Sequence, residues 1–154
     1  MIKNGISIIK ENAVTTLATI ADKSEHEFEP YFRETLEFLI GFLNEFSSPA
    51  YKRFRGQTVE SITLICAAVT VEVFWPLADD VIKVLLHIQN NELDQHMLSS
   101  WQRICLLMKE DFAPYLKDVI PPILKMASLQ PSMGVSGGDH LAKLVDVLAE
   151  VTPN

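Results

Sequence analysis

The sequence predicts an all-α fold: a right-handed α-solenoid of about three helical hairpins, with a further helix at the C-terminal end. Two observations lead to this prediction. Apolar residues recur at helical spacing through most of the chain, and no stretch alternates polar and apolar residues as a half-buried strand does. A proline-centred motif also occurs three times, and such self-similarity is typical of repeat proteins.

Each copy of the motif has a phenylalanine two residues before a proline, and an amphipathic run follows the proline. The prolines are 46 residues apart (30 to 76) and then 38 residues apart (76 to 114). This is close to the spacing of paired-helix repeats of the HEAT and armadillo kind, roughly 40 to 47 residues. We therefore expect each copy to mark the turn into the second helix of a hairpin. The copies are Phe28-Glu29-Pro30-Tyr31-Phe32, Phe74-Trp75-Pro76-Leu77 and Phe112-Ala113-Pro114-Tyr115-Leu116.

The three runs keep one register after the aligned prolines. The fourth residue on is always acidic, and the sixth, ninth, tenth and twelfth are always apolar. A register held at five positions indicates a repeated structure. The aligned sets are Glu34, Asp80 and Asp118; Leu36, Ile82 and Ile120; Leu39, Leu85 and Ile123; Ile40, Leu86 and Leu124; and Phe42, Ile88 and Met126.

The chemistry of proline predicts the local structure of each turn. Proline suits the first turn of a helix, because the N–H that it lacks would have no partner there. It also disfavours the α region for the residue before it, so Glu29, Trp75 and Ala113 are expected to end connections. The phenylalanine before that residue is expected to fold back onto the new helix as an anchor.

The predicted domain of HEAT repeats covers residues 1–131, with repeats at about 5–46, 48–91 and 93–131. Asp94 is expected to cap the first helix of the third repeat. Residues 132–139 are rich in glycine and serine, which predicts a flexible loop. Residues 140–154 carry apolar residues at helical spacing, which allows an additional helix.

Composition excludes several classes of function. The chain has 154 residues, a net charge of −7 and a pI near 5.0, which argues against direct binding of nucleic acid. The longest apolar stretch, 59–75, contains Glu60 and Glu72, so no membrane insertion is expected. No signal peptide is visible at the N-terminus. Cys66 and Cys105 lie in apolar runs without metal-site spacing, and we interpret them as buried, reduced thiols of an intracellular protein.

Nothing in the sequence indicates catalysis. The four histidines have neither the spacing of metal ligands nor a neighbouring nucleophile, and no glycine-rich phosphate-binding motif occurs. We therefore expect a protein that is not an enzyme and that needs no metal or cofactor. The histidines are His26, His87, His96 and His140.

Four stretches resemble the importin-β (karyopherin-β) family of nuclear transport receptors, in the same order as in the family. The most specific is the arginine-glycine-x-threonine-x-glutamate helix at 55–65, Arg55-Gly56-Gln57-Thr58-Val59-Glu60-Ser61-Ile62-Thr63-Leu64-Ile65. The resemblance covers roughly residues 12 to 131. The other stretches are 14–22 (VTTLATIAD), 97–105 (MLSSWQRIC) and 124–131 (LKMASLQP).

The resemblance implies HEAT repeats from the middle of a large import receptor that shuttles between cytoplasm and nucleus. Such receptors bind basic cargo signals on their concave surface and Phe-Gly nucleoporins on their outer surface. They release cargo when they meet Ran-GTP, and the resemblance allows that other parts of the full receptor bind Ran-GTP. The alternative is a HEAT-repeat scaffold of another multiprotein complex.

The aligned acidic residues are the main candidates for a partner-binding site. If the repeats stack in parallel, Glu34, Asp80 and Asp118 form a row, with Glu37 and Asp79 nearby, that suits a lysine- or arginine-rich peptide. In the alternative interpretation, these acids form a solvated face. They would then stabilise the first turns of their helices through the helix dipole and form ion pairs with Arg33, Lys83 or Lys117.

Aromatic and basic residues supply further candidates. Trp75 lies in a turn and is either a partner-binding anchor or a core residue. Trp101 lies on an apolar stripe and is interpreted as core. Lys52, Arg53 and Arg55 are interpreted as a solvated basic face, with partner binding as the alternative.

Overall fold

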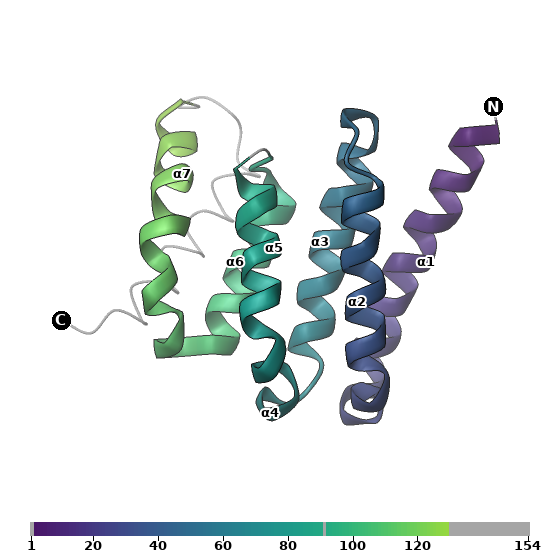
Figure 1. The fold of residues 1–154 in the computed structure, drawn as a ribbon, viewed down its shortest axis with the longest axis horizontal. Coiled ribbons are helices and arrows are strands. Elements are labelled where there is room, and N and C mark those ends of the chain that lie inside the picture. The colour runs from purple at the N-terminus through teal and green to yellow at the C-terminus, as the bar shows by residue number, and fades with distance from the viewer. Residues whose placement is uncertain (1, 91, 130–154) are drawn as a thin grey trace. The chain divides into compact units, whose positions relative to one another are not determined.

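The computed structural model describes residues 2–90 and 92–129, and all regular structure in these ranges is helical (Figure 1). The prediction of an all-α fold is therefore confirmed. The loop predicted at 132–139 and the helix predicted at 140–154 lie outside the described residues. Contacts divide the chain into two compact units, 1–79 and 80–154.

The first unit begins with a helical hairpin and continues into a third long helix. Its long helices are α1 (Ile2–Ser24), α2 (Glu29–Glu45) and α3 (Lys52–Ala67). Four short elements connect or follow them: η1 (Glu25–Phe28), η2 (Pro49–Tyr51), α4 (Val71–Phe74) and η3 (Trp75–Leu77). Helices α1 and α2 both pack against α3, and Figure 1 shows the three side by side.

The core of the first unit lies around α3. This helix is buried over most of its circumference, including its glycine, Gly56. A helical glycine costs roughly 1 kcal/mol relative to alanine, and its burial here fits the close packing that the sequence predicted. The buried apolar residues of α1 and α2 are Val14, Ala18, Ala21, Phe32, Leu36, Leu39 and Leu43.

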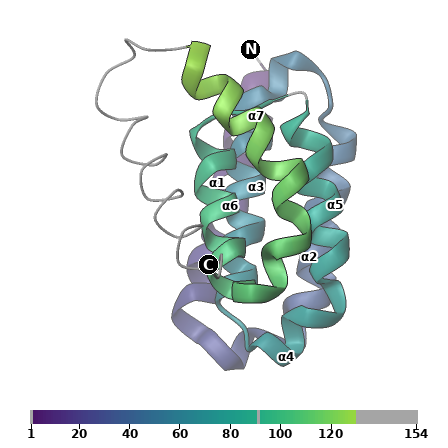
Figure 2. The same cartoon turned by 90° about the vertical axis from the view of Figure 1, so that its left-hand side faces the viewer.

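The second unit contains α5 (Ala78–Gln89), whose first residues precede the boundary, α6 (Gln95–Met108) and α7 (Leu116–Leu129). A 3-10 helix, η4 (Lys109–Tyr115), connects α6 to α7 (Figure 2). Asp94 Oδ1 accepts a hydrogen bond of 3.1 Å from the N–H of Met97, so the predicted N-cap is confirmed. Lys109 ends α6 with a positive φ of 52°, which non-glycine residues rarely adopt.

Burial confirms the repeat register at its acidic and ninth positions, whereas the apolar residue at the tenth position is half-buried in Ile40 and Leu86 and exposed in Leu124. The acidic side chain at the fourth position after each proline is exposed, and the apolar side chain at the ninth position is buried. The phenylalanines Phe28, Phe74 and Phe112 are also buried, as expected of anchors. Each copy of the motif therefore supplies one buried ring at the start of a second helix.

The backbone prediction for the residue before each proline was wrong. Glu29 (φ −53°, ψ −39°) and Trp75 (φ −53°, ψ −44°) both have helical backbone angles. The chain stays in 3-10 or α-helical conformation through each turn, so it does not become extended before the proline. We attribute this to the buried phenylalanine one residue earlier, whose burial offsets the unfavourable α conformation.

Arg55 differs from its predicted role as part of a solvated basic face. Its side chain is buried, and Nη1 donates hydrogen bonds of 2.6 Å to the carbonyl of Phe46 and 2.5 Å to that of Ser48. The last carbonyls of a helix lack partners within the helix and carry partial negative charge. Arg55 therefore closes the C-terminal end of α2, while Lys52 and Arg53 remain exposed as predicted.

Both cysteines are buried, as the sequence predicted. Burial raises the pKa of the Cys66 thiol above its ordinary value and raises that of Cys105 to about 11. Across 2–90 and 92–129, no helix is long and apolar enough to cross a membrane.

Candidate partner-binding surfaces

The acidic candidates all lie at exposed positions of second helices. Glu34 and Glu37 are one turn apart on α2, Asp79 and Asp80 are in the first turn of α5, and Asp118 is in the first turn of α7. Glu34 and Glu37 thus share one face of a single helix in the first unit. Asp80 and Asp118 belong to the second unit. A single row running from Glu34 to Asp118 remains a prediction.

Two of these carboxylates have basic neighbours on their own helix. Arg33 Nη1 lies 3.8 Å from Glu37 Oε1, and Lys83 Nζ lies 4.0 Å from Asp80 Oδ1. Exposed pairs at such distances contribute little stability, typically about 0 to 1 kcal/mol. Within the described residues, the carboxylates of Glu34 and Asp118 form no ion pair. Their charges are therefore available to a partner at little cost.

Trp75 is accessible to a partner. It lies in η3 with 46% of its surface exposed, and Val71, one turn earlier, is also 46% exposed. The ring of Phe74 between them is buried and anchors this turn. Trp101, in contrast, is fully buried, which confirms its interpretation as a core residue.

An aromatic cluster at the α2–α3 turn was not singled out in the sequence. Phe42 lies 4.5 Å from Phe38 and 5.8 Å from Phe54 between ring centroids, and Phe46 lies 5.0 Å from Tyr51. Lys10 Nζ lies 4.2 Å from the centroid of the Phe46 ring, and the negative face of the ring attracts the positive charge of the ammonium group. The spacing of Phe38, Phe42 and Phe46 at every fourth residue was the signal that could have revealed it.

Glu29 joins the start of α2 to the start of α4. Its Oε1 accepts a hydrogen bond of 3.0 Å from the N–H of Thr70, 41 residues later. Hydrogen bonding from Thr70 is the main reason that the pKa of Glu29 lies below its ordinary value, and the charge of His26 also lowers it. Sequence reasoning did not predict this long-range contact.

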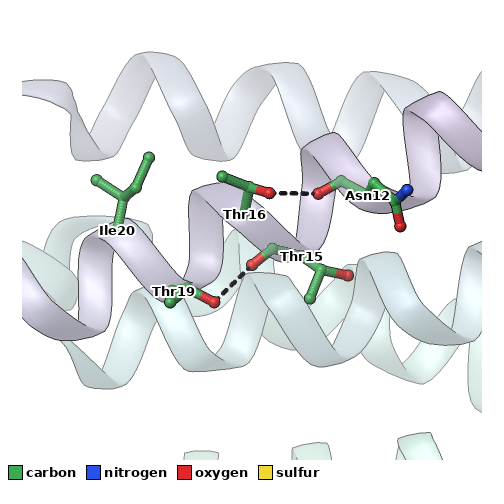
Figure 3. A pocket seen from close by; sticks show the side chains of 5 residues that line it. All are labelled: Asn12, Thr15, Thr16, Thr19 and Ile20. Atoms are coloured by element: carbon green, nitrogen blue, oxygen red, sulfur yellow. Dashed lines mark hydrogen bonds between the residues drawn. The ribbon is translucent and has the colours of Figure 1, made fainter.

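Two shallow pockets lie in the first unit. One is formed by α1 alone, through Asn12, Thr15, Thr16, Thr19 and Ile20 (Figure 3). The other lies where α1 and α3 end, between Asp22, Glu25, His26 and residues 67–70. In the described part of the chain, no group of three or more His, Cys, Asp or Glu side chains is arranged to hold a metal ion.

Comparison of the sequence with known proteins identifies importins. The chain is 31% identical over 133 residues to importin subunit beta-3 of Saccharomyces cerevisiae, covering 82% of this chain and 12% of that protein. It is 25% identical over 141 residues to a probable importin-5 homologue of Dictyostelium discoideum, covering 87% of this chain and 13% of that protein. No family model matches the chain. The chain therefore spans only about an eighth of the length of these relatives.

Comparison of the fold identifies solved structures of Kap121p. The structure of Kap121p bound to Pho4p matches with a TM-score of 0.71 and 26% identity, covering 94% of this chain and 17% of that one. Kap121p bound to Nup53p matches with a TM-score of 0.69 and 26% identity, over 94% of this chain and 16% of that one. Kap121p bound to RanGTP matches with a TM-score of 0.66 and 27% identity, over 92% of this chain and 16% of that one.

Proposed function

Because the chain belongs to the importin-β (karyopherin-β) family, we propose that it acts in nuclear import as a non-catalytic segment of a transport receptor. In this proposal the acidic residues of the second helices bind basic localisation signals of cargo proteins. The observation that carries the proposal is the exposed carboxylate at one register position of all three copies, Glu34, Asp80 and Asp118. A receptor of this kind shuttles between cytoplasm and nucleus.

The binding chemistry follows from the charges. Lysine and arginine side chains form charge-assisted hydrogen bonds with carboxylates, and arginine can engage both oxygens at once. Glu34 and Glu37, one turn apart, offer neighbouring carboxylates to successive basic residues of an extended peptide. Because the site is exposed, salt screens each contact, and affinity depends on many weak contacts.

The solved complexes of Kap121p support a proposal about further partners of the receptor that contains this segment. That protein has been solved bound to Pho4p, to Nup53p and to RanGTP. We propose that the full receptor containing this segment likewise binds cargo, Phe-Gly nucleoporins and Ran-GTP. Trp75, which is exposed beside Val71, is the candidate apolar anchor within this segment.

The experiment is fluorescence anisotropy of a lysine-rich localisation peptide titrated with the protein at low and high salt. The test variant combines Glu34→Lys, Asp80→Lys and Asp118→Lys. The control combines Glu45→Lys, Glu110→Lys and Asp111→Lys, at exposed acids outside the register position. Each substitution of an acid by lysine changes the charge by +2. Both triple variants therefore change the net charge from −7 to −1.

The proposal predicts salt-sensitive binding that the test variant weakens at least about tenfold and the control weakens much less, since only the former removes direct contacts. Equal weakening by both variants would show that only net charge matters, and the acids would then form a solvated face. Absence of binding by the wild type would favour a scaffold that holds other protein partners.

A further inference from the structure

Helix α7 contains two adjacent prolines, Pro121 and Pro122, in its interior. Proline has no backbone N–H, and its ring crowds the carbonyl four residues earlier, so each proline removes one helical hydrogen bond. Pro121 removes the donor for the carbonyl of Lys117, and Pro122 removes the donor for the carbonyl of Asp118. The first turn of α7, which carries the candidate residue Asp118, therefore lacks two of the hydrogen bonds that normally hold such a turn.

The carbonyl that Pro122 leaves without a helical donor receives a donor from another helix. Nε2 of Gln89, the last residue of α5, donates a hydrogen bond of 3.1 Å to the carbonyl of Asp118. This hydrogen bond is partly buried, and the side chain of Gln89 is 3% exposed. Buried backbone carbonyls need a partner, because an unpaired one keeps the full cost of leaving water. Gln89 thus replaces the N–H that Pro122 lacks.

Trp101 determines which way the side-chain amide of Gln89 points. The indole N–H of Trp101 donates to Oε1 of Gln89 over 2.6 Å, and the ring is fully buried. Indole is a donor only, so the amide oxygen has to face it and the amide nitrogen is left for the carbonyl of Asp118. The opposite orientation of the amide would place two donors against each other. Gln89 is therefore held in the one orientation that serves α7.

The network lies within the second unit and connects three helices to the candidate site. Gln89 ends α5, Trp101 belongs to α6, and Asp118 is in the first turn of α7 (Figure 1). Only the backbone of Asp118 takes part, so its exposed carboxylate stays available to a partner. The buried side of this turn thus has a fixed partner while its exposed side carries the charge.

We propose that Gln89 is a positioning residue for the acidic site. By replacing the donor that Pro122 lacks, it holds the first turn of α7 in the orientation that presents the Asp118 carboxylate to a lysine or arginine of a partner. Charge-assisted hydrogen bonds depend on direction as well as distance, so a turn that moves weakens them. The replacement of the donor stands independently, whereas the effect on binding rests on the proposed function.

A double-mutant cycle in urea unfolding tests the replacement of the donor. Pro122→Ala restores an N–H that can donate to the carbonyl of Asp118, as in a regular helix. The increase in the unfolding equilibrium constant caused by Gln89→Met should therefore be about fivefold smaller in this background than in the wild type, which corresponds to one neutral hydrogen bond.

Pro121→Ala is the matched control for the cycle, because it restores a donor to the carbonyl of Lys117 and none to that of Asp118. Gln89→Met should have its full effect in the Pro121→Ala background. An effect of Gln89→Met that is equally large in the Pro122→Ala and Pro121→Ala backgrounds would overturn the replacement.

Fluorescence anisotropy with the lysine-rich peptide tests the positioning role, at a temperature where circular dichroism shows each variant to be folded. Gln89→Met and Asp118→Asn should each weaken binding about two- to fivefold, as expected for one exposed ion pair. The double variant should bind no more weakly than Asp118→Asn alone, since both changes remove the same contact. Adding Pro122→Ala to Gln89→Met should restore the affinity.

Ile104→Ala is the control for a general loss of stability, because it leaves a cavity in the buried side of α6 in the same unit. It should leave the affinity of the folded protein unchanged. Equal weakening by Ile104→Ala and Gln89→Met, or additive weakening by Gln89→Met and Asp118→Asn, would overturn the positioning role. Unchanged binding by Asp118→Asn would refute the proposed function at this residue and the positioning role with it. The unfolding cycle would still decide whether Gln89 replaces the missing donor.

Discussion

Trp101 donates its indole N–H to Oε1 of Gln89 over 2.6 Å, and both side chains are buried. The amide nitrogen of the same Gln89 donates to the backbone carbonyl of Asp118 over 3.1 Å. One glutamine thus joins the end of α5 to the middle of α6 and the start of α7. This contact positions the helix turn that carries the candidate residue Asp118.

Replacing Gln89 with Met is expected to destabilise the second unit by about 2 to 3 kcal/mol. The change keeps the volume but leaves the buried indole N–H and the Asp118 carbonyl without this partner. Urea unfolding measures the effect. Gln95→Met, at an exposed position of α6, is the control and is expected to lie within about 0.5 kcal/mol of the wild type. Similar losses in both variants would mean that the hydrogen bonds of Gln89 contribute nothing specific.

Replacing Arg55 with Met is expected to cost about 2 to 4 kcal/mol, because the carbonyls of Phe46 and Ser48 lose a charged donor. Arg55→Lys should recover only part of this loss, since an ammonium group lacks the planar geometry of the guanidinium. Arg53→Met is the control, because the Arg53 side chain is 80% exposed and lies 3.9 Å from Glu11. An unchanged midpoint of denaturation in the Arg55→Met variant would show that the hydrogen bonds from Arg55 to the end of α2 contribute no stability.

The Glu29 carboxylate is expected to make stability depend on pH. Its pKa in the folded protein lies below the ordinary value of 4.5, so the unfolded chain binds the proton more tightly. The stabilisation is therefore fully present above pH 4.5 and is lost as the pH falls through the lower, folded pKa.

Thermal melting of the wild type and Glu29→Gln over a series of pH values measures this contribution. The difference between the two melting temperatures should be largest near neutral pH and should shrink in acid. Glu27→Gln removes an exposed charge two residues away and serves as the control. A difference that stays constant with pH would show that the Glu29–Thr70 contact is not sensitive to protonation.

Both cysteines are expected to resist alkylation in the folded protein. They are buried, and the raised pKa of each thiol, about 11 for Cys105, keeps the reactive thiolate scarce near neutral pH. Mass spectrometry after iodoacetamide treatment should show slow labelling without urea and rapid labelling of both thiols in urea. Fast labelling of either cysteine in the native protein would indicate that its helix opens readily.

The features predicted correctly from sequence are those that local periodicity determines. The helices, the exposed acids after each proline, the buried Phe28, Phe74 and Phe112 and the Asp94 cap all depend on residues within about one or two turns. The backbone before Pro30 and Pro76 was predicted wrongly, because burial of the neighbouring phenylalanine outweighs the local preference.

The features that sequence reasoning missed depend on distant residues. Arg55 reaches back to Phe46, Gln89 meets Trp101, and Glu29 meets Thr70. Nothing in the residues themselves indicates these partners, since the contacts exist only after the helices pack. For the candidate site, the exposure of each acidic residue followed from the repeat register, while their alignment into one row depends on packing between repeats.

The different burial of Trp75 and Trp101 gives the protein two distinct optical probes. The chain contains two tryptophans, one in each compact unit. Trp75 is 46% exposed and Trp101 is fully buried, so the emission of Trp75 is expected to be red-shifted and more open to quenching by small solutes than that of Trp101. Selective quenching therefore separates the fluorescence of the two units without any label. The order in which they unfold can then be followed in the natural sequence.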